Sequence, residues 1–327
     1  MRKASIGILA TFLVAACAGP GPAPSASSPV TPSQSPSASP IATVPSPSPV
    51  PQRVETSLPV ALEESGAAVA GGKLYVVGGF DAAGNSLRTV WVFDGSAWSA
   101  GPRLPLGLDH VSAASLDDQL YVAGGHSFGR DSARFFRLDG SSWTELAPMR
   151  HARGGHALVA TANRLYVIGG NAGTANVAPA EVYDPQTRAW SDLPALPVPR
   201  NHVAGFEFGL TVCVAGGRSP ATARVDCFDP GSSTWLRAPD LPQPTSGAGA
   251  TSLEDGRAVI LGGQDAQETS IVPQFAQLPD PTAWTVQEPM LVPRHGFELA
   301  LFKGRAWACG GGTLPGLHPV ATCTSVV

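Results

Sequence analysis

The sequence has little charge and no run of apolar residues long enough to span a bilayer. Only 14% of its 327 residues are charged and the net charge is −4, so no basic surface is expected and nucleic acid is not expected as a partner. The predominantly apolar segment from Ala4 to Ala16 is too short to cross a membrane as a helix. After residue 20, no stretch of about 12 residues has the periodicity of an amphipathic helix, which argues against a helical fold.

Glycine and proline are abundant instead. The chain contains 37 glycines and 32 prolines, a balance that favours many short strands joined by turns. Residues 18–51 hold 11 of the prolines together with 9 serines and carry no charge. Because such a segment can bury little apolar area, we predict that residues 17–51 form a disordered linker.

The N-terminal residues have the layout of a secretory signal. Arg2 and Lys3 precede the apolar segment. It ends in VAAC, residues 14–17, which resembles the lipobox of bacterial lipoproteins. The resemblance implies that residues 1–16 are a signal peptide and that Cys17 carries a lipid. The protein would then be exported to the cell membrane or outer membrane and face the periplasm or exterior. The alternative is a plain secretory signal that ends at a chance cysteine.

One phrase recurs along the rest of the chain. Strand-like stretches such as LYVVGG and LYVIGG end in glycine pairs that begin at residues 78, 124, 169, 216, 262 and 310, so the period is 45–48 residues. Five of the six pairs follow a tryptophan by 26 or 27 residues, and each period has room for four short strands. A constant period of this size indicates repeated supersecondary units, which bury their faces by packing against one another around an axis.

The sequence resembles the kelch-repeat family over residues 53–327. The motifs that carry the resemblance are the glycine pair after an LYV strand, the VYDP strand and the tryptophan. The resemblance implies an all-β fold, a six-bladed β-propeller with four-stranded blades. The sixth repeat lacks its tryptophan strand, and the segment that begins at Gln52 aligns with the missing strand. We therefore expect an N-terminal strand to complete the last blade and to close the ring of a domain over residues 52–327.

Four cysteines follow Cys17. Cys213 and Cys227 are expected on the second and third strands of blade 4, and Cys309 and Cys323 on the same strands of blade 6. Antiparallel neighbours can bring each pair opposite one another, and an exported chain meets oxidising conditions, so we predict disulfides Cys213–Cys227 and Cys309–Cys323. Buried free thiols are the alternative. No histidine lies at ligand spacing from either pair, and no metal site or cofactor is predicted.

Reactive side chains collect at one expected end of the propeller, where the blade connections and the loops after the glycine pairs open. The candidate ligand-binding residues are Glu64, His110, His126, Arg130, Arg153, Arg200, His202 and Arg294. Under one interpretation the arginines at the starts of inner strands hold blades together through carbonyls and acids. Under the other, several of them point into the channel mouth and bind an anionic or polar ligand, because the guanidinium fork matches a carboxylate.

These features favour a monomeric binding head that recognises a protein or carbohydrate ligand, held at a membrane by the N-terminal lipid. Some kelch proteins are copper oxidases, but the four tyrosines here occupy repeated strand positions. Another alternative is an exported kelch sugar mutarotase or epimerase, which needs an acid–base group; Glu63, Glu64 and Asp109 are the candidates. A purely structural envelope protein is a third. No catalytic residue is assigned.

Overall fold

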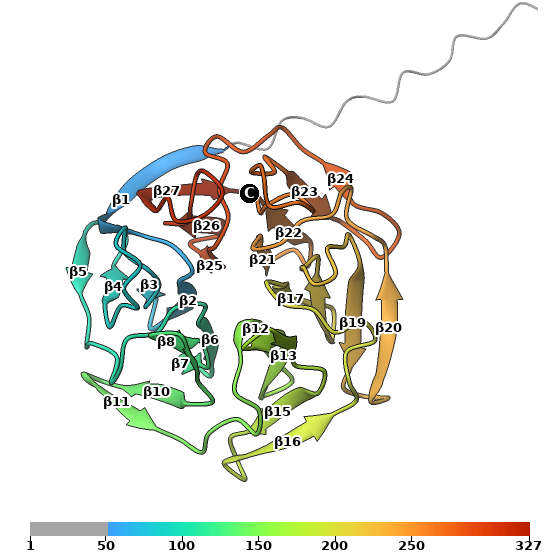
Figure 1. Cartoon of the computed structure of the whole chain (residues 1–327), viewed down its shortest axis with the longest axis horizontal. Coiled ribbons are helices and arrows are strands. Elements are labelled where there is room, and N and C mark those ends of the chain that lie inside the picture. The colour runs from blue at the N-terminus through green and yellow to red at the C-terminus, as the bar shows by residue number, and fades with distance from the viewer. Residues whose placement is uncertain (1–51) are drawn as a thin grey trace, which may run out of the picture. The chain divides into compact units, whose positions relative to one another are not determined.

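The computed structural model describes residues 52–327, so the predictions for residues 1–51, Cys17 among them, lie outside the described residues. Residues 52–327 contain 27 strands and no helix. The strands form six antiparallel sheets of four main strands each, arranged around a central axis (Figure 1). The predicted all-β, six-bladed propeller is therefore confirmed. Within this range no helix is long and apolar enough to cross a membrane.

Each blade runs from an inner strand beside the axis to an outer strand at the rim (Figure 1). The inner strands are β2 (Gly66–Ala70), β6 (Ser112–Leu116), β12 (Gly154–Thr161), β17 (Ala204–Phe208), β21 (Gly249–Ser252) and β25 (Leu299–Phe302). The second strands are β3 (Lys73–Val77), β7 (Gln119–Ala123), β13 (Arg164–Ala172), β18 (Thr211–Ala215), β22 (Ala258–Leu261) and β26 (Arg305–Cys309).

The third strands are β4 (Val90–Phe93), β10 (Phe135–Asp139), β15 (Ala180–Asp184), β19 (Val225–Asp229), β23 (Phe275–Leu278) and β27 (Val320–Val326). The outer strands are β5 (Trp98–Ala100), β11 (Ser142–Glu145), β16 (Ala189–Leu193), β20 (Thr234–Ala238), β24 (Thr285–Val286) and, for the last blade, β1 (Arg53–Leu62). Two short additions lie in loops: β8 (His126–Ser127) pairs with β9 (Arg130–Asp131), and β14 (Ala175–Asn176) pairs with β13.

The hydrophobic core is divided among the blade interfaces. Six clusters of buried apolar side chains lie between successive blades, including the interface of the last blade with the first. Between blades 2 and 3, for example, Phe135 packs edge-on against Tyr183 and Trp190 at centroid distances of 4.8 and 5.0 Å. Because every sheet contributes both faces to such clusters, no blade can bury its apolar residues without both neighbours.

The ring closes through the N-terminal strand, as predicted. Strand β1 pairs antiparallel with β27, with Arg53 opposite Ser325 and Thr56 opposite Cys323. In four other blades the tryptophan indole donates to a carbonyl of the preceding blade connection, as Trp143 does to Pro102 at 2.8 Å. Gln52 stands at the equivalent position and donates to Pro289 at 2.8 Å. An amide thus replaces the indole where the chain closes on itself.

The glycine pairs are needed because backbone from the next blade connection lies against them. Gly78 and Gly79 have φ values of 64° and 93°. A β-carbon at Gly78 would lie 2.5 Å from the carbonyl oxygen of Leu108. The amide of Gly79 donates to the carbonyl of Leu108 at 2.8 Å, in the connection to blade 2. The glycine pair at the end of each repeated motif is therefore needed for the contact between neighbouring blades.

Both expected disulfides are present. Cys213 and Cys227 lie directly opposite one another on β18 and β19, and Cys309 and Cys323 do so on β26 and β27. Each bridge joins residues that are 14 positions apart and links the second and third strands of one blade. The bridges therefore brace blades 4 and 6 internally and do not connect one blade to the next.

Candidate functional site

Six equivalent residues, one from each blade connection, form a closed ring of backbone hydrogen bonds around the axis; we call it the axial ring. Each amide donates to the carbonyl of the ring residue in the preceding connection: Glu64 to Gly296 (2.6 Å), His110 to Glu64 (2.9 Å), Gly155 to His110 (3.0 Å), His202 to Gly155 (2.6 Å), Gly247 to His202 (2.9 Å) and Gly296 to Gly247 (2.8 Å). The ring fixes the separation and direction of all six residues, so side chains on it are held by the whole propeller.

Every residue of the axial ring has a positive φ, between 49° and 66°. Glycine occupies three of the six positions, where this conformation is free of strain. The other three positions carry Glu64, His110 and His202. A side chain in the left-handed region costs about 1 kcal/mol or more, and such strain concentrates at functional sites. The three strained positions are therefore candidate functional residues.

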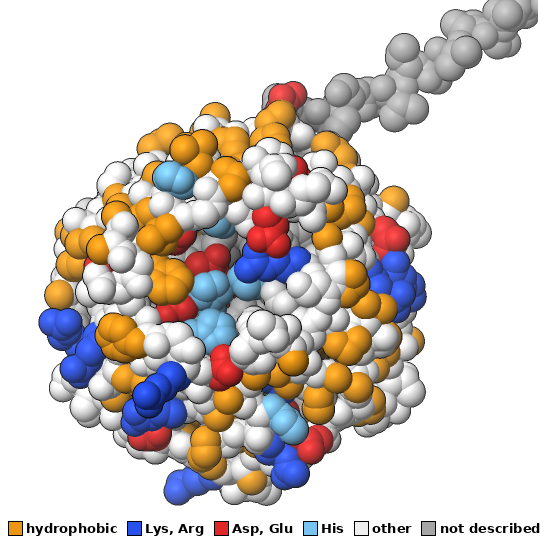
Figure 2. Space-filling view, in the orientation of Figure 1, with side chains coloured by type: hydrophobic (Ala, Val, Ile, Leu, Met, Phe, Trp, Pro, Cys, Tyr) orange, Lys and Arg blue, Asp and Glu red, His pale blue; other side chains and the backbone are white. Residues whose placement is uncertain are grey.

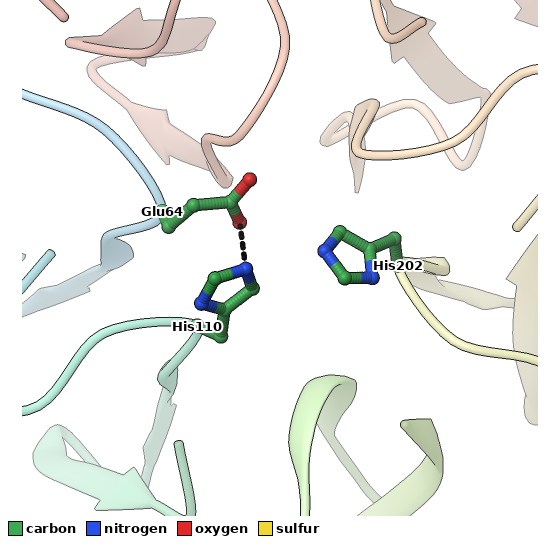
Figure 3. A group of neighbouring side chains, drawn as sticks. All are labelled: Glu64, His110 and His202. Carbon is green, nitrogen blue, oxygen red and sulfur yellow. Dashed lines mark ion pairs between the residues drawn. The ribbon is translucent and has the colours of Figure 1, made fainter. Parts of the chain in front are cut away.

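The three ring side chains converge on one region near the axis (Figure 3). The carboxylate of Glu64 and the ring nitrogens of His110 and His202 offer one ligand atom each, all within 4.8 Å of one another. The distance from His110 Nε2 to Glu64 Oε2 is 3.7 Å. The spacing of these residues in the sequence predicted that they lie at the same end of the propeller, but it did not predict a group of metal ligands.

The orientation of both imidazoles is set by the residue that precedes each of them. His110 Nδ1 donates to Asp109 Oδ1 at 2.7 Å, and Asp109 is itself buried and accepts a hydrogen bond from Ser86. His202 Nδ1 donates to Asn201 Oδ1 at 2.6 Å. In both rings the proton is thus held on Nδ1. Nε2 of His110 faces Glu64 at 3.7 Å, and Nε2 of His202 accepts a hydrogen bond from Arg218 Nη2 at 2.8 Å.

A cavity of about 300 Å³ opens above the axial ring; we call it the mouth cavity. Figure 2 shows histidines at the centre of this face, with acidic and basic side chains beside them. Its polar lining comprises Glu63, Glu64, His110, Arg218, Gln264, Glu268 and His295, and Phe80 and Leu317 supply apolar walls. Below it, the central channel contains a smaller cavity of about 90 Å³, which Glu64, His110 and His202 line.

Burial and neighbouring charges set the protonation of these groups. Burial, together with the negative charge of Glu64, raises the pKa of Glu63 to about 7. Burial lowers the pKa of His202 well below its usual value, and the charges of His110 and Arg218 act in the same direction. Burial also acts to lower the pKa of His110, but the carboxylates of Glu64 and Asp109 outweigh this effect and raise it. At neutral pH His202 is therefore an uncharged acceptor.

The three candidate arginines do not face the mouth cavity. Arg153, Arg200 and Arg294 are completely buried, and each lies inside its own blade. Each guanidinium donates to the carbonyl of the first glycine of its blade's pair: Arg153 to Gly169, Arg200 to Gly216 and Arg294 to Gly310. The structure therefore favours the interpretation in which these arginines hold the blades together.

Two of these arginines also form buried ion pairs. Arg153 Nη2 donates to Glu181 at 2.7 Å and Arg200 Nη1 to Asp226 at 2.9 Å, and in both pairs the side chains are 0–1% exposed. Arg294 bonds only to carbonyl oxygens, and burial lowers its pKa to about 10. Blade 6 thus keeps the arginine of the repeat without the acid that accompanies it in blades 3 and 4.

The two remaining candidates lie on the paired strands β8 and β9, after the glycine pair of blade 2. The imidazole of His126 contacts that of His110 at a centroid distance of 5.2 Å, and its Nδ1 pairs with Asp131 at 3.1 Å. Arg130 is exposed on β9. The residues that line the cavity do not include either of them.

The candidates predicted from the sequence did not include several lining residues, among them Phe80, Arg218, Gln264, Glu268, His295 and Leu317. Phe80 and Gln264 follow glycine pairs directly, as Arg218 does, so that position was a usable signal. Glu268 and Leu317 come from loops that share no spacing with the other repeats.

Fold and site together define a six-bladed propeller with a polar mouth at one end of its axis. The family model described as the KLHDC2/KLHL20/DRC7 Kelch-repeats domain matches residues 50–217, half of the chain. The chain therefore belongs to the kelch-repeat family.

Individual relatives agree with this assignment. The chain is 26% identical to Kelch-like protein terF of Aspergillus terreus over 296 residues, which cover 81% of this chain and 63% of that protein. It is 34% identical to Kelch-like protein 35 of Mus musculus over 139 residues, 41% of this chain and 23% of that protein. It thus spans less than two thirds of the length of these curated relatives. A solved structure titled "Structure of YjhT" superimposes with a TM-score of 0.69 at 17% identity and covers 83% of this chain and 96% of that one, which shows a shared fold.

Proposed function

We propose that this chain is an exported, lipid-anchored binding protein whose propeller recognises a polar ligand in the mouth cavity. One observation carries the proposal: polar side chains from separate blades, among them His110, Arg218, Gln264 and His295, converge on one recess of about 300 Å³. Binding sites are typically concave recesses of this size or larger with a few convergent polar groups. Kelch propellers typically serve as interaction domains, which supports binding as the role.

The charges of the cavity indicate what kind of ligand it suits. Arg218 is the arginine of the lining, and it already pairs with Glu268. Glu63 and Glu64 bring further carboxyl groups to the same recess. Since the lining offers both hydrogen-bond donors and acceptors, the cavity matches a polyhydroxylated glycan unit better than a purely anionic ligand. A polar segment of a protein is the alternative ligand.

Substitutions in the cavity test this role. We expect Gln264→Ala and Arg218→Ala each to weaken binding of a ligand found by glycan and peptide array, measured in the presence of a metal chelator. A lost charge-assisted bond to Arg218 corresponds to about 1.5–3 kcal/mol of binding free energy. Arg134→Ala is the matched control, because Arg134 forms an exposed ion pair with Glu145 on the outer part of blade 2. Equal affinity of Arg218→Ala, Gln264→Ala and the control would place the ligand elsewhere.

Export and anchoring rest on residues 1–17. The proposed lipid on Cys17 would hold the head at the cell or outer membrane, facing the periplasm or the exterior, and residues 17–51 would act as the spacer. We expect intact-mass measurement of membrane-extracted protein to show an acylated N-terminus at Cys17, and Cys17→Ser to leave the signal uncleaved or to release the protein. A mature N-terminus elsewhere, without acyl mass, would contradict the anchor.

A second candidate function, proton transfer to or from a bound sugar, is favoured by Glu63. Its carboxyl lines the mouth cavity and has a pKa near 7, which suits a general acid–base group at neutral pH. The buried arginines cannot hold a substrate carboxylate, so only Arg218 remains for that role among the arginines of the cavity. Glu63→Gln should abolish turnover of a sugar while retaining its binding if this function holds.

A further inference from the structure

The axial ring presents a donor set typical of a metal centre. The Glu64 carboxylate and the imidazoles of His110 and His202 offer one ligand atom each, and these atoms lie within 4.8 Å of one another. Two imidazoles and one carboxylate are ligands that zinc and other first-row transition metals accept in proteins. We propose that Glu64, His110 and His202 bind a divalent transition-metal ion such as Zn²⁺ at the base of the mouth cavity.

The distances require only a small adjustment. Zinc–ligand bonds of about 2.0–2.1 Å place the donors of a tetrahedral site about 3.3 Å apart. His110 Nε2 and Glu64 Oε2 are already 3.7 Å apart. The three donors lie within 4.8 Å of one another, so shared coordination requires His202 Nε2 to shift by about 1.5 Å at most, while the backbone stays where the axial ring holds it.

The groups behind the ligands have the arrangement found at metal sites. Ligating histidines in proteins almost always donate their second ring nitrogen to a carboxylate or carbonyl, which fixes the tautomer and orients the ring. Asp109 does this for His110, and the amide oxygen of Asn201 does it for His202. Asn201 is in turn held by Asn176, to which it donates at 2.6 Å. Both imidazoles are therefore prepared to offer Nε2 as a donor.

One protein group competes with the ion. Arg218 Nη2 donates to His202 Nε2 at 2.8 Å, so it uses the lone pair that the metal needs. The same guanidinium already pairs with Glu268 and can remain there when the bond to His202 is broken. The other charged or titratable groups nearest the site are Glu63, His126 and His295. Glu64 and His110 also line the mouth cavity, so a ligand in that cavity would lie next to the ion.

The experiment titrates the full chain with Zn²⁺ by calorimetry and with Co²⁺ by visible absorption. We expect one equivalent of metal and a tetrahedral Co²⁺ spectrum. His110→Gly and His202→Gly should lose this binding while their melting temperatures stay equal or rise. Glycine is the residue at the three equivalent ring positions, where φ is also positive, so these variants keep the backbone and relieve its strain.

Three further variants separate this site from adventitious binding. His151→Ala removes an imidazole that is 39% exposed and distant in sequence from the ligands, and should leave the affinity unchanged. Asp109→Asn should weaken the affinity about 10–100-fold. Arg218→Met should strengthen it, because the competing donor and its positive charge are gone. Failure of the parent chain to bind, retention of binding by His110→Gly and His202→Gly, or no gain in Arg218→Met would each overturn the assignment. None of these readouts depends on the organic ligand.

Discussion

Deletion of residues 53–60 is expected to abolish cooperative folding of the propeller. The deletion removes most of β1, including the buried side chain of Leu58, and leaves β27 as an unpaired edge. It also brings a proline-rich segment to the place of the strand, and proline cannot donate to a ladder. Since native domains are stable by only about 5–15 kcal/mol, loss of the closing strand should exceed what the fold can tolerate.

Graded variants show whether closure itself is responsible. Leu58→Ala should cost about 2–5 kcal/mol. Gln52→Ala removes the hydrogen bonds of the side-chain amide with Glu288, Pro289 and Leu291, each of which contributes about 0.5–1.5 kcal/mol. The matched control lacks residues 30–37, an equal number taken from the proline- and serine-rich segment. Urea unfolding followed by tryptophan fluorescence measures all four. Identical midpoints for the two deletions would show that β1 does not close the ring.

Glu181→Gln is expected to destabilise the protein by about 3–5 kcal/mol, because it leaves the buried charge of Arg153 without a counter-ion. Glu181 is completely buried and also accepts the backbone amides of Arg150 and His151. The change is nearly isosteric, so a loss of this size reports the charge and not the packing. Denaturant midpoints of the single variants and of Arg153→Met/Glu181→Gln give the coupling energy of the pair.

Blade 6 provides an internal control for this pair. Arg294 is as deeply buried as Arg153 but has no carboxylate partner. Arg294→Met therefore leaves no acid unpaired, and it should cost less than Arg153→Met. If the two substitutions cost the same, the carbonyl bonds that they share would account for the stabilisation and the ion pair would contribute nothing.

The fold was predictable because its determinants repeat. Glycine pairs, tryptophans and short apolar strands recur with one period, and the register of Gln52 against that period indicated the closing strand. The direction of the buried arginines was not predictable to the same degree. A residue at the start of an inner strand can point toward the axis or into its blade, and the choice depends on contacts such as Glu181, which lies 28 residues further along the chain.

The site was predictable only in part for a related reason. Equivalent spacing placed Glu64, His110 and His202 at one end of the propeller, but spacing alone does not show the tautomers that Asp109 and Asn201 impose. Glu268 reaches the cavity from a loop whose length and composition are particular to blade 5. The location of a residue at an equivalent position of each repeat can be inferred from the symmetry of the propeller. The location of a residue in an irregular loop cannot.

The axial ring has a consequence for how this scaffold can diversify. Its bonds use only main-chain atoms, so a change of side chain at a ring position does not remove any of these bonds. A β-carbon at Gly247 would meet no atom closer than 3.3 Å, and that position can accept a new group for little more than the cost of its backbone conformation. Recognition and architecture are thus separable here. Evolution or protein design can therefore change the side chains near the axis in one blade at a time while the six sheets keep their arrangement.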